Sequence, residues 1–223
     1  VQRRQSEEQI RRALEEKAVL LREIHHRVTN NLMVISSLLS LGARLVQDAE
    51  ASILFRESQN QILAMARVHQ HLYRSDDLAR VPMAAYIREL LDRLQLSFAA
   101  RQVVITTDLA DVSLTVNDAV PCGLIINELA TNALEHAFSA GVPRPPGELD
   151  RLRVTFLQAG DQLELVIEDN GVGLPVEWAA GMSQTLGLEL VRVLVGQLRG
   201  TWDVFSRPGQ GTRFTVIFAP RSD

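Results

Sequence analysis

The feature that most constrains the fold is the first part of the chain, where residues 5–46 contain no proline and a single glycine, Gly42. Apolar residues recur there at alternating steps of four and three, the spacing that places side chains on one face of a helix. One long helix is therefore predicted, on the order of 60 Å at about 1.5 Å per residue. Its expected seam consists of Ile10, Leu14, Leu21, Ile24, Val28, Ile35 and Leu38, with Lys17 and Asn31 as polar breaks.

A helix of that length needs a partner, and a second periodic segment follows directly. It carries Ile53, Leu54, Ile62, Met65, Val68 and Leu72 and ends before the polar cluster at 75–77 and Pro82. The two segments predict an antiparallel hairpin. Because two helices cover each other on one side only, we expect a second copy to complete a four-helix bundle in a homodimer.

After Pro82 the pattern changes to a mixture of helices and strands. Helices are predicted over 83–99, 118–138 and 186–198, and strands over 103–109, 113–116, 151–157, 162–169, 201–206 and 212–219, with a loop over 139–150. The predicted fold class is thus α+β, with a helical dimerisation hairpin in residues 1–78 followed by an α/β sandwich in residues 79–223.

Composition excludes several classes of protein. A net charge of -4 and a pI near 5.8 give no basic surface for nucleic acid. No run reaches the roughly 20 apolar residues of a membrane span. The single cysteine, Cys122, cannot form an internal disulfide, which favours a reducing compartment such as the cytoplasm. The chain begins with valine and lacks a signal-peptide core, so we expect a fragment whose N-terminal sensor domain is missing.

The first of three motifs with candidate chemistry is NELATNALEHAF, residues 127–138. Its polar side chains follow one another by steps of three and four, which would place them along one side of a helix. These residues are Asn127, Glu128, Thr131, Asn132 and Glu135. A face this polar on an otherwise apolar helix requires either a ligand or solvent.

The other two motifs combine glycine with polar residues. In EDNGVGLP a strand ends at Asp169 and turns through Gly171 and Gly173, whose backbone could approach a flat or anionic group. In QTLGLELVRVL, Thr185 and Gly187 open a helix whose first amides suit a phosphate.

Each motif alone also has an ordinary structural explanation. An Asp-Asn-Gly run is usually only a turn, polar positions on a helix usually face solvent, and Gly187 could be a close-packing position. The order of the motifs, followed by GQGTRFTVIF with a turn before the last strand, favours one binding site over a coincidence.

Residues 127–138, 168–175, 185–191 and 209–214 resemble the N box, the two glycine boxes and the final Gly-Thr turn of the Bergerat-type ATP-binding domain. Sensor histidine kinases, type II topoisomerases, mismatch-repair ATPases and heat-shock chaperones share that domain. EIHHRVTNNLMVISSLLSL is similar to the phosphoacceptor motif of the HWE and second-HisKA classes of sensor histidine kinase. The resemblance covers residues 20–219 and implies an ATP-dependent, autophosphorylating protein-histidine kinase of a two-component system.

The resemblance also implies roles in binding ATP and Mg²⁺. Asn132 would hold Mg²⁺ through its side-chain oxygen and contact the phosphates. Asp169 would accept a hydrogen bond from the exocyclic amine of adenine, with Gly171 and Gly173 against the base and Thr212 beside it. Further nucleotide contacts are expected from Asn127, His136, Thr185, Leu186, Gly187 and Leu188.

His26 is the expected phosphoacceptor. The heptad spacing places it opposite the predicted seam, and the resembling motif has its acceptor directly before the arginine, here Arg27. An exposed imidazole with an ordinary pKa of about 6.5 is mostly neutral and nucleophilic at neutral pH. Asn30, one turn further, would hold the other ring nitrogen. The remaining histidines of the helices, His25, His69 and His71, are interpreted as structural or surface residues.

Glu23 and Glu128 are both candidates for the general base, and the resemblance makes Glu128 a candidate for polarising the attacking group. The chain departs from the class at Thr29, where lysine is usual, and at Glu135, which stands where a basic residue is common. Arg192 or His136 would compensate for Glu135. The segment 175–185 is short for an ATP lid and is expected to be mobile.

From His26 the phosphoryl group would pass to an aspartate of a response regulator. The alternative hypothesis is a non-catalytic dimeric module that reports ATP occupancy. A chaperone-like or topoisomerase-like ATPase is disfavoured by the long helix that carries the histidines.

Overall fold

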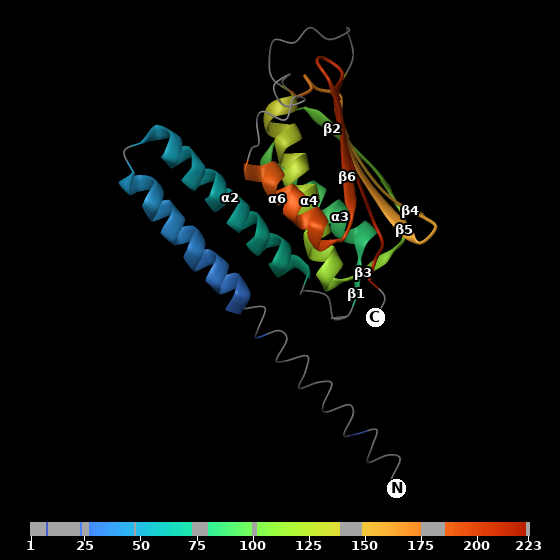
Figure 1. The fold of residues 1–223 in the computed structure, drawn as a ribbon, viewed down its shortest axis with the longest axis horizontal. Helices are drawn as coiled ribbons and strands as arrows, with labels where there is room; N and C mark the ends of the chain where they lie inside the picture. The colour runs from blue at the N-terminus through green and yellow to red at the C-terminus, as the bar shows by residue number, and fades with distance from the viewer. Residues whose placement is uncertain are drawn as a thin grey trace. The chain divides into compact units, whose positions relative to one another are not determined.

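The computed structural model describes residues 8, 23, 27–46, 48–72, 80–99, 102–138, 149–174 and 186–221. The chain divides into two compact units, Val1–Leu78 and Ala79–Asp223, whose elements are labelled in Figure 1. Within the described ranges, no helix combines the length and the hydropathy that crossing a membrane requires.

The first unit contains the predicted helical hairpin. A helix over residues 27–45 and helix α2 (Ala49–Leu72) lie side by side in opposite directions (Figure 1). Asp48 begins α2, because its Oδ1 accepts the Ala51 N–H at 3.2 Å and pairs a donor that the helix end leaves unmatched. The helices approach closely at Gly42, where a Cβ would lie 2.9 Å from Cε1 of Phe55. The part of the predicted long helix at 9–22 and 24–26 falls outside the described residues.

The face that packs within the hairpin differs from the predicted seam. The buried and half-buried positions of the first helix are Thr29, Leu32, Ser36, Leu39, Ser40, Gly42 and Ala43, whereas Val28, Ile35 and Leu38 of the predicted seam are exposed. The exposed positions Val34, Leu38, Leu41 and Leu45, here called the outer stripe, repeat by four, three and four. Apolar residues surround this helix almost completely, so their period identified a helix without selecting the face that meets α2.

The second unit is a two-layer α/β sandwich with a five-stranded sheet in the order β2-β4-β5-β7-β6. The strands are β2 (Val103–Leu109), β4 (Asp150–Ala159), β5 (Gln162–Asp169), β6 (Thr201–Arg207) and β7 (Gly211–Phe218). β2 and β4 are parallel, and the other neighbours are antiparallel. Helices α3 (Met83–Ser97), α4 (Val116–Asn132) and α6 (Leu186–Gln197) cover one face of the sheet (Figure 1).

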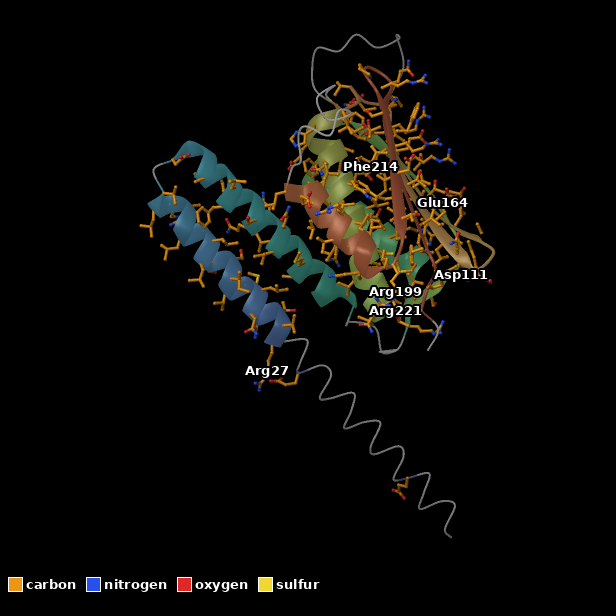
Figure 2. All side chains as sticks on the ribbon, viewed as in Figure 1. Arg27, Asp111, Glu164, Arg199, Phe214 and Arg221 are labelled. Carbon is orange, nitrogen blue, oxygen red and sulfur yellow. The ribbon has the colours of Figure 1, made fainter. Side chains whose placement is uncertain are left out.

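The core of this unit lies between the helices and the sheet. Leu152, Val154 and Phe156 of β4 are fully buried at alternate positions, as a strand with one covered face requires. Figure 2 shows Phe214 on the covered side of the sheet and Glu164 projecting from the other side. Burying each large apolar side chain contributes about 1.5–3 kcal/mol. The strand ends that carry the predicted motifs therefore stand on a well-packed layer.

An ion pair between buried Asp118 and partly exposed Arg221 fixes the ends of two helices. Asp118, in the first turn of α4, accepts the Arg221 N–H at 2.9 Å and lies 3.3 Å from Arg221 Nε. The same guanidinium donates to the Gln197 carbonyl at the end of α6 at 2.6 Å. The C-terminal segment thus joins α4 to α6, the two helices that carry the first and third motifs.

The predicted fold class is confirmed, and the predicted elements of this unit agree with the observed ones to within a few residues at each end. Two details were wrong. β1 (Arg80–Pro82), which pairs with β3 (Ser113–Thr115), was missed because three residues ending in proline show no alternation. The predicted helix 118–138 is α4 followed by a π-turn, η1 (Ala133–Ala137).

Candidate functional site

The carboxylate of Asp169 lies at the end of β5 and is almost buried. It pairs in register with Thr212 of β7, which is also buried. Its Oδ1 accepts the Gly171 N–H at 2.8 Å, an Asx turn that fixes the carboxylate. A carboxylate and a hydroxyl are thereby presented side by side, a suitable pair for a polar, planar ligand such as a purine base.

The loop after Asp169, residues 170–174, is tied to its surroundings on several sides. Asn170 accepts the Arg151 N–H at 2.7 Å and donates to the Leu149 carbonyl at 3.0 Å. The Val172 N–H donates to the Ala137 carbonyl at 2.9 Å. The Asp-Asn-Gly run is thus a turn, in agreement with the simplest structural explanation of its sequence. The turn also connects β5 to η1, which follows α4.

Three glycines permit this close packing because a side chain at each would collide with backbone. A Cβ at Gly171 would lie 2.3 Å from the Ala137 carbonyl oxygen, and one at Gly211 would lie 1.9 Å from that of Asp169. Gly173 and Gly211 also have φ of +77° and +82°, values that favour glycine. Gly171 and Gly173 were predicted to admit a ligand. The structure adds that both admit the close approach of the protein's own chain, and Gly211, which was not predicted, does the same.

Like Gly211, the hydroxyl of Ser206 belongs to the site and was not predicted from the sequence. Ser206 of β6 pairs in register with Thr212. Its Oγ accepts the Leu174 N–H at 2.8 Å and lies 3.1 Å from both the Gly211 carbonyl oxygen and Thr212 Oγ1. No motif marks this serine, and only the pairing of β6 with β7 places it beside the site.

Glu128 and Asn132 of α4 form the helical side of the site, opposite the start of α6. Asn132 Nδ2 donates to Glu128 Oε1 at 3.5 Å. A Cβ at Gly187, the second residue of α6, would lie 1.9 Å from the same Glu128 oxygen. Gly187 is therefore a close-packing position that brings a carboxylate against the first turn of α6, while Leu188 is buried in the core.

These residues suit a nucleotide with its metal ion. The amide nitrogen of Asn132 lies 3.5 Å from Glu128 Oε1, at the long limit of a hydrogen bond, and its carbonyl oxygen is a hard ligand of the kind that Mg²⁺ takes. Within the described ranges there is no cluster of three or more His, Cys, Asp or Glu that could hold a metal. A single amide oxygen such as that of Asn132 fits an ion that is held by one or two protein oxygens and by the phosphates of its nucleotide.

The remaining predicted site residues lie at the edges of this arrangement. Asn127, Glu128, Thr131 and Asn132 are half-buried, but Glu135 and His136 are exposed in η1, with His136 Nε2 at 3.7 Å from Glu135 Oε2. The row of polar residues predicted along the helix thus ends at Asn132, where the π-turn begins. Leu186 begins α6, and Thr185 with the rest of 175–185 lies outside the described residues.

The predicted acceptor His26 also lies outside the described residues, as does His25. Next to them, Arg27 Nε donates to Glu23 Oε1 at 2.8 Å on the exposed surface; Figure 2 labels Arg27 at the start of the described helix. Asn30 is exposed one turn further. Glu23, the alternative base, is thus engaged by the arginine that follows the acceptor.

Fold and site together define an ATPase domain of the class shared by histidine kinases, DNA gyrase B and HSP90. Residues 117–222 match the family described as Histidine kinase-, DNA gyrase B-, and HSP90-like ATPase. Residues 23–98 match the family described as Histidine kinase. The chain belongs to the histidine kinase family, with a domain of the second-HisKA type before the ATPase domain.

Curated relatives and solved structures agree with this assignment. The chain is 32% identical, over 90% of its length, to the sensor histidine kinase PdtaS of Mycolicibacterium smegmatis and spans 40% of that protein. It is 29% identical over 86% of its length to blue-light-activated histidine kinase 2 of Erythrobacter litoralis and spans 54% of it. The histidine kinase domain of the Erythrobacter litoralis EL346 protein shares the fold, with a TM-score of 0.63 at 21% identity, covering 86% of this chain and 94% of that one.

Proposed function

We propose that this chain is the kinase core of a two-component system, which transfers a phosphoryl group from ATP to His26 and then to an aspartate of a response regulator. The observation that carries the proposal is the pairing of buried Asp169 with Thr212, joined through Val172 and Ala137 to the helix that carries Asn132. It is supported by the match of residues 23–98 to histidine kinases.

Asp169 and Thr212 would hold the adenine, and Asn132 would hold Mg²⁺ at the phosphates. When bound, ATP supplies the γ-phosphoryl group. His26 would attack through a neutral ring nitrogen, forming the N–P bond as the bond between phosphorus and the bridging oxygen breaks and ADP leaves. Asn30 would bond the other ring nitrogen and fix the tautomer, while Arg27 would face the phosphate oxygens.

Glu128 would orient the attacking imidazole, or accept its proton, from its position against the first turn of α6. Because an aligned nucleophile and charge stabilisation dominate phosphoryl transfer, this role is secondary to the positioning of His26. Asn127, Leu186, Gly187 and Leu188 would line the phosphate side. For Thr185 and His136, a contact with the nucleotide remains a prediction.

We also propose the assembly. Residues 1–78 would form the dimerisation hairpin and residues 79–223 the catalytic domain, with the outer stripe at the homodimer interface. A sensor domain N-terminal to this chain and a response-regulator receiver domain would be the other partners. The single cysteine supports a reducing compartment, the cytoplasm.

The test is incubation of the full chain with γ-labelled ATP and Mg²⁺. We expect an acid-labile label on the wild type, a loss of at least 100-fold in His26→Ala, and unchanged ATP affinity in that variant. The matched control is His25→Ala, which should keep the label. ATP binding without label in the wild type would instead support the non-catalytic module, and steady hydrolysis without phosphoprotein would support a chaperone-like ATPase.

A further inference from the structure

The side chain of Ser206 joins two parts of the site that the strands alone do not connect. One is the loop after Asp169, whose Leu174 N–H reaches Ser206 Oγ at 2.8 Å. The other is the start of β7, where the Gly211 carbonyl oxygen and Thr212 Oγ1 each lie 3.1 Å from the same atom. Ser206 is half-buried on β6, so the three contacts are partly shielded from water.

The hydrogen bonds of this hydroxyl determine how Thr212 faces the site. Ser206 has one proton, and its lone pairs accept the Leu174 N–H. If Ser206 donates to the Gly211 carbonyl, then Thr212 donates to Ser206 and turns its lone pairs outward. If Ser206 donates to Thr212 Oγ1, the Thr212 proton is available to a ring nitrogen that accepts. In both cases the direction of the Thr212 O–H depends on Ser206.

We infer that Ser206 is a positioning residue for adenine recognition, which acts by fixing the Thr212 hydroxyl beside Asp169 and by anchoring loop 170–174. This inference rests on the proposed binding of ATP at the site. In register, Asp169, Thr212 and Ser206 lie on three adjacent strands, β5, β7 and β6, so the serine supports the pair from the side away from Asp169. A hydroxyl held from one side presents a single geometry to the base, which lowers the ordering cost of binding.

The first test is calorimetric titration of the full chain with ATP. Ser206→Ala should raise the Kd about five- to tenfold, the effect of losing one hydrogen bond, and Ser206→Thr, which keeps a hydroxyl, should bind within twofold of the wild type. The matched control is Ser97→Ala, which removes a hydroxyl bonded only locally to the Arg93 carbonyl at 3.0 Å and should not change the Kd. In autophosphorylation, KM for ATP should rise by the same factor with kcat within twofold.

The second test is a double-variant cycle with Thr212→Val, which keeps the shape and removes the hydroxyl. We assign the effect of Ser206 on affinity to its contact with Thr212 and test the anchoring of the loop by a separate readout, so the double variant should bind ATP within twofold of Thr212→Val alone. Additive losses would overturn the inference. So would a Ser206→Ala variant that binds like the wild type.

A third readout needs no nucleotide. In Ser206→Ala the Leu174 amide should exchange its hydrogen at least tenfold faster, whereas in Ser97→Ala its rate should be unchanged. An unchanged rate in Ser206→Ala would remove the anchoring role. Should Ser206→Ala fail to fold, Ser206→Cys, of similar size and weaker hydrogen bonding, should show the same losses in both measurements.

The two proposals fail in different ways. A wild-type chain that binds ATP but never labels His26 contradicts the kinase function, and the Ser206 tests still apply. Normal labelling of His26 with unchanged ATP affinity in Ser206→Ala contradicts only the inference about Ser206. A wild-type chain that binds no ATP overturns both.

Discussion

The two units bury apolar surface to very different degrees. In the sandwich, side chains as large as Phe156, Phe218 and Met83 are fully buried. In the hairpin, among residues whose burial is described, only Ser36 and Ala66 are buried, while Leu38 and Leu45 expose 62% and 74% of their surface. The sandwich therefore completes its core within one chain, and the hairpin does not.

This difference in burial suggests different roles for the two units. A site on a close-packed sandwich keeps its geometry, because such a core resists deformation. A hairpin with an open apolar face depends for its stability on what covers that face. We expect changes in the hairpin's partner to alter the hairpin, which His26 directly precedes in the sequence, while the geometry at Asp169 and Thr212 stays constant.

The largest expected effect comes from Gly211→Ala. The new Cβ would meet the Asp169 carbonyl oxygen at 1.9 Å, and φ is +82°. Because backbone on both sides must move, the free energy of unfolding of the sandwich should fall by about 3 kcal/mol or more, and ATP binding should be lost. Urea unfolding followed by tryptophan fluorescence reports this unit alone, since both tryptophans, Trp178 and Trp202, belong to it.

Two glycines provide contrasting controls. Gly42→Ala in the hairpin meets only the ring of Phe55, a side chain that can turn, so the hairpin should change by less than about 1 kcal/mol. Gly196→Ala in α6 meets nothing within 4 Å and should stabilise the sandwich by about 0.5–1 kcal/mol. A Gly211→Ala variant as stable as Gly42→Ala would contradict the view that the sandwich is the more rigid unit.

The sequence predicted the parts of the site that depend on local spacing. Asp169 at a strand end and the amide-rich helix were recognisable because each motif is contiguous. Ser206 was not recognisable, because it joins the site only through the register of β6 on β7. Gly211 stood inside a quoted motif, yet its contact with the Asp169 carbonyl oxygen also depends on strand pairing.

In the hairpin the same limit applies to helix faces. The period of the first helix predicted a helix and a partner, and α2 is present at the expected place. It did not predict that Leu32, Ser36 and Leu39 face inward while Leu38 faces outward. Small residues mark the inward face, since Gly42 lies against the Phe55 ring and the Ala43 carbonyl accepts from Ser52 Oγ of α2 at 3.4 Å.

Leu38→Glu tests whether the hairpin needs a partner to cover its open face, because it places a charge in the middle of the outer stripe. If the stripe forms the proposed dimer interface, both copies bury this charge, and the dimer Kd should rise at least 100-fold. Sedimentation equilibrium at micromolar concentration measures the change. ATP affinity should stay within twofold, because the sandwich has its own core.

The matched control is Leu96→Glu, at a leucine of α3 that exposes 77% of its surface in the sandwich. It adds the same charge to an isolated apolar position and should leave both the dimer and the ATP affinity unchanged. A wild-type chain that sediments as a monomer would contradict the dimer, and an unchanged Kd in Leu38→Glu would remove the outer stripe from its interface.

The smallest expected effect concerns Cys122, which is fully buried in α4. Burial, with the nearby charge of Asp118, raises the pKa of this thiol far above its ordinary value. The unfolded chain loses the thiol proton above about pH 8.5 while the folded chain keeps it, so this stability is complete below that pH and falls as pH rises, by roughly 1.4 kcal/mol per unit. Burial also raises the pKa of Tyr86, whose contribution to stability falls only above about pH 10.

Urea unfolding of the sandwich between pH 8 and 10 should therefore show a steeper loss of unfolding free energy with pH in the wild type than in Cys122→Ala. Equal slopes would mean that the thiol ionises in the folded protein and that this core is more open to water than its packing indicates.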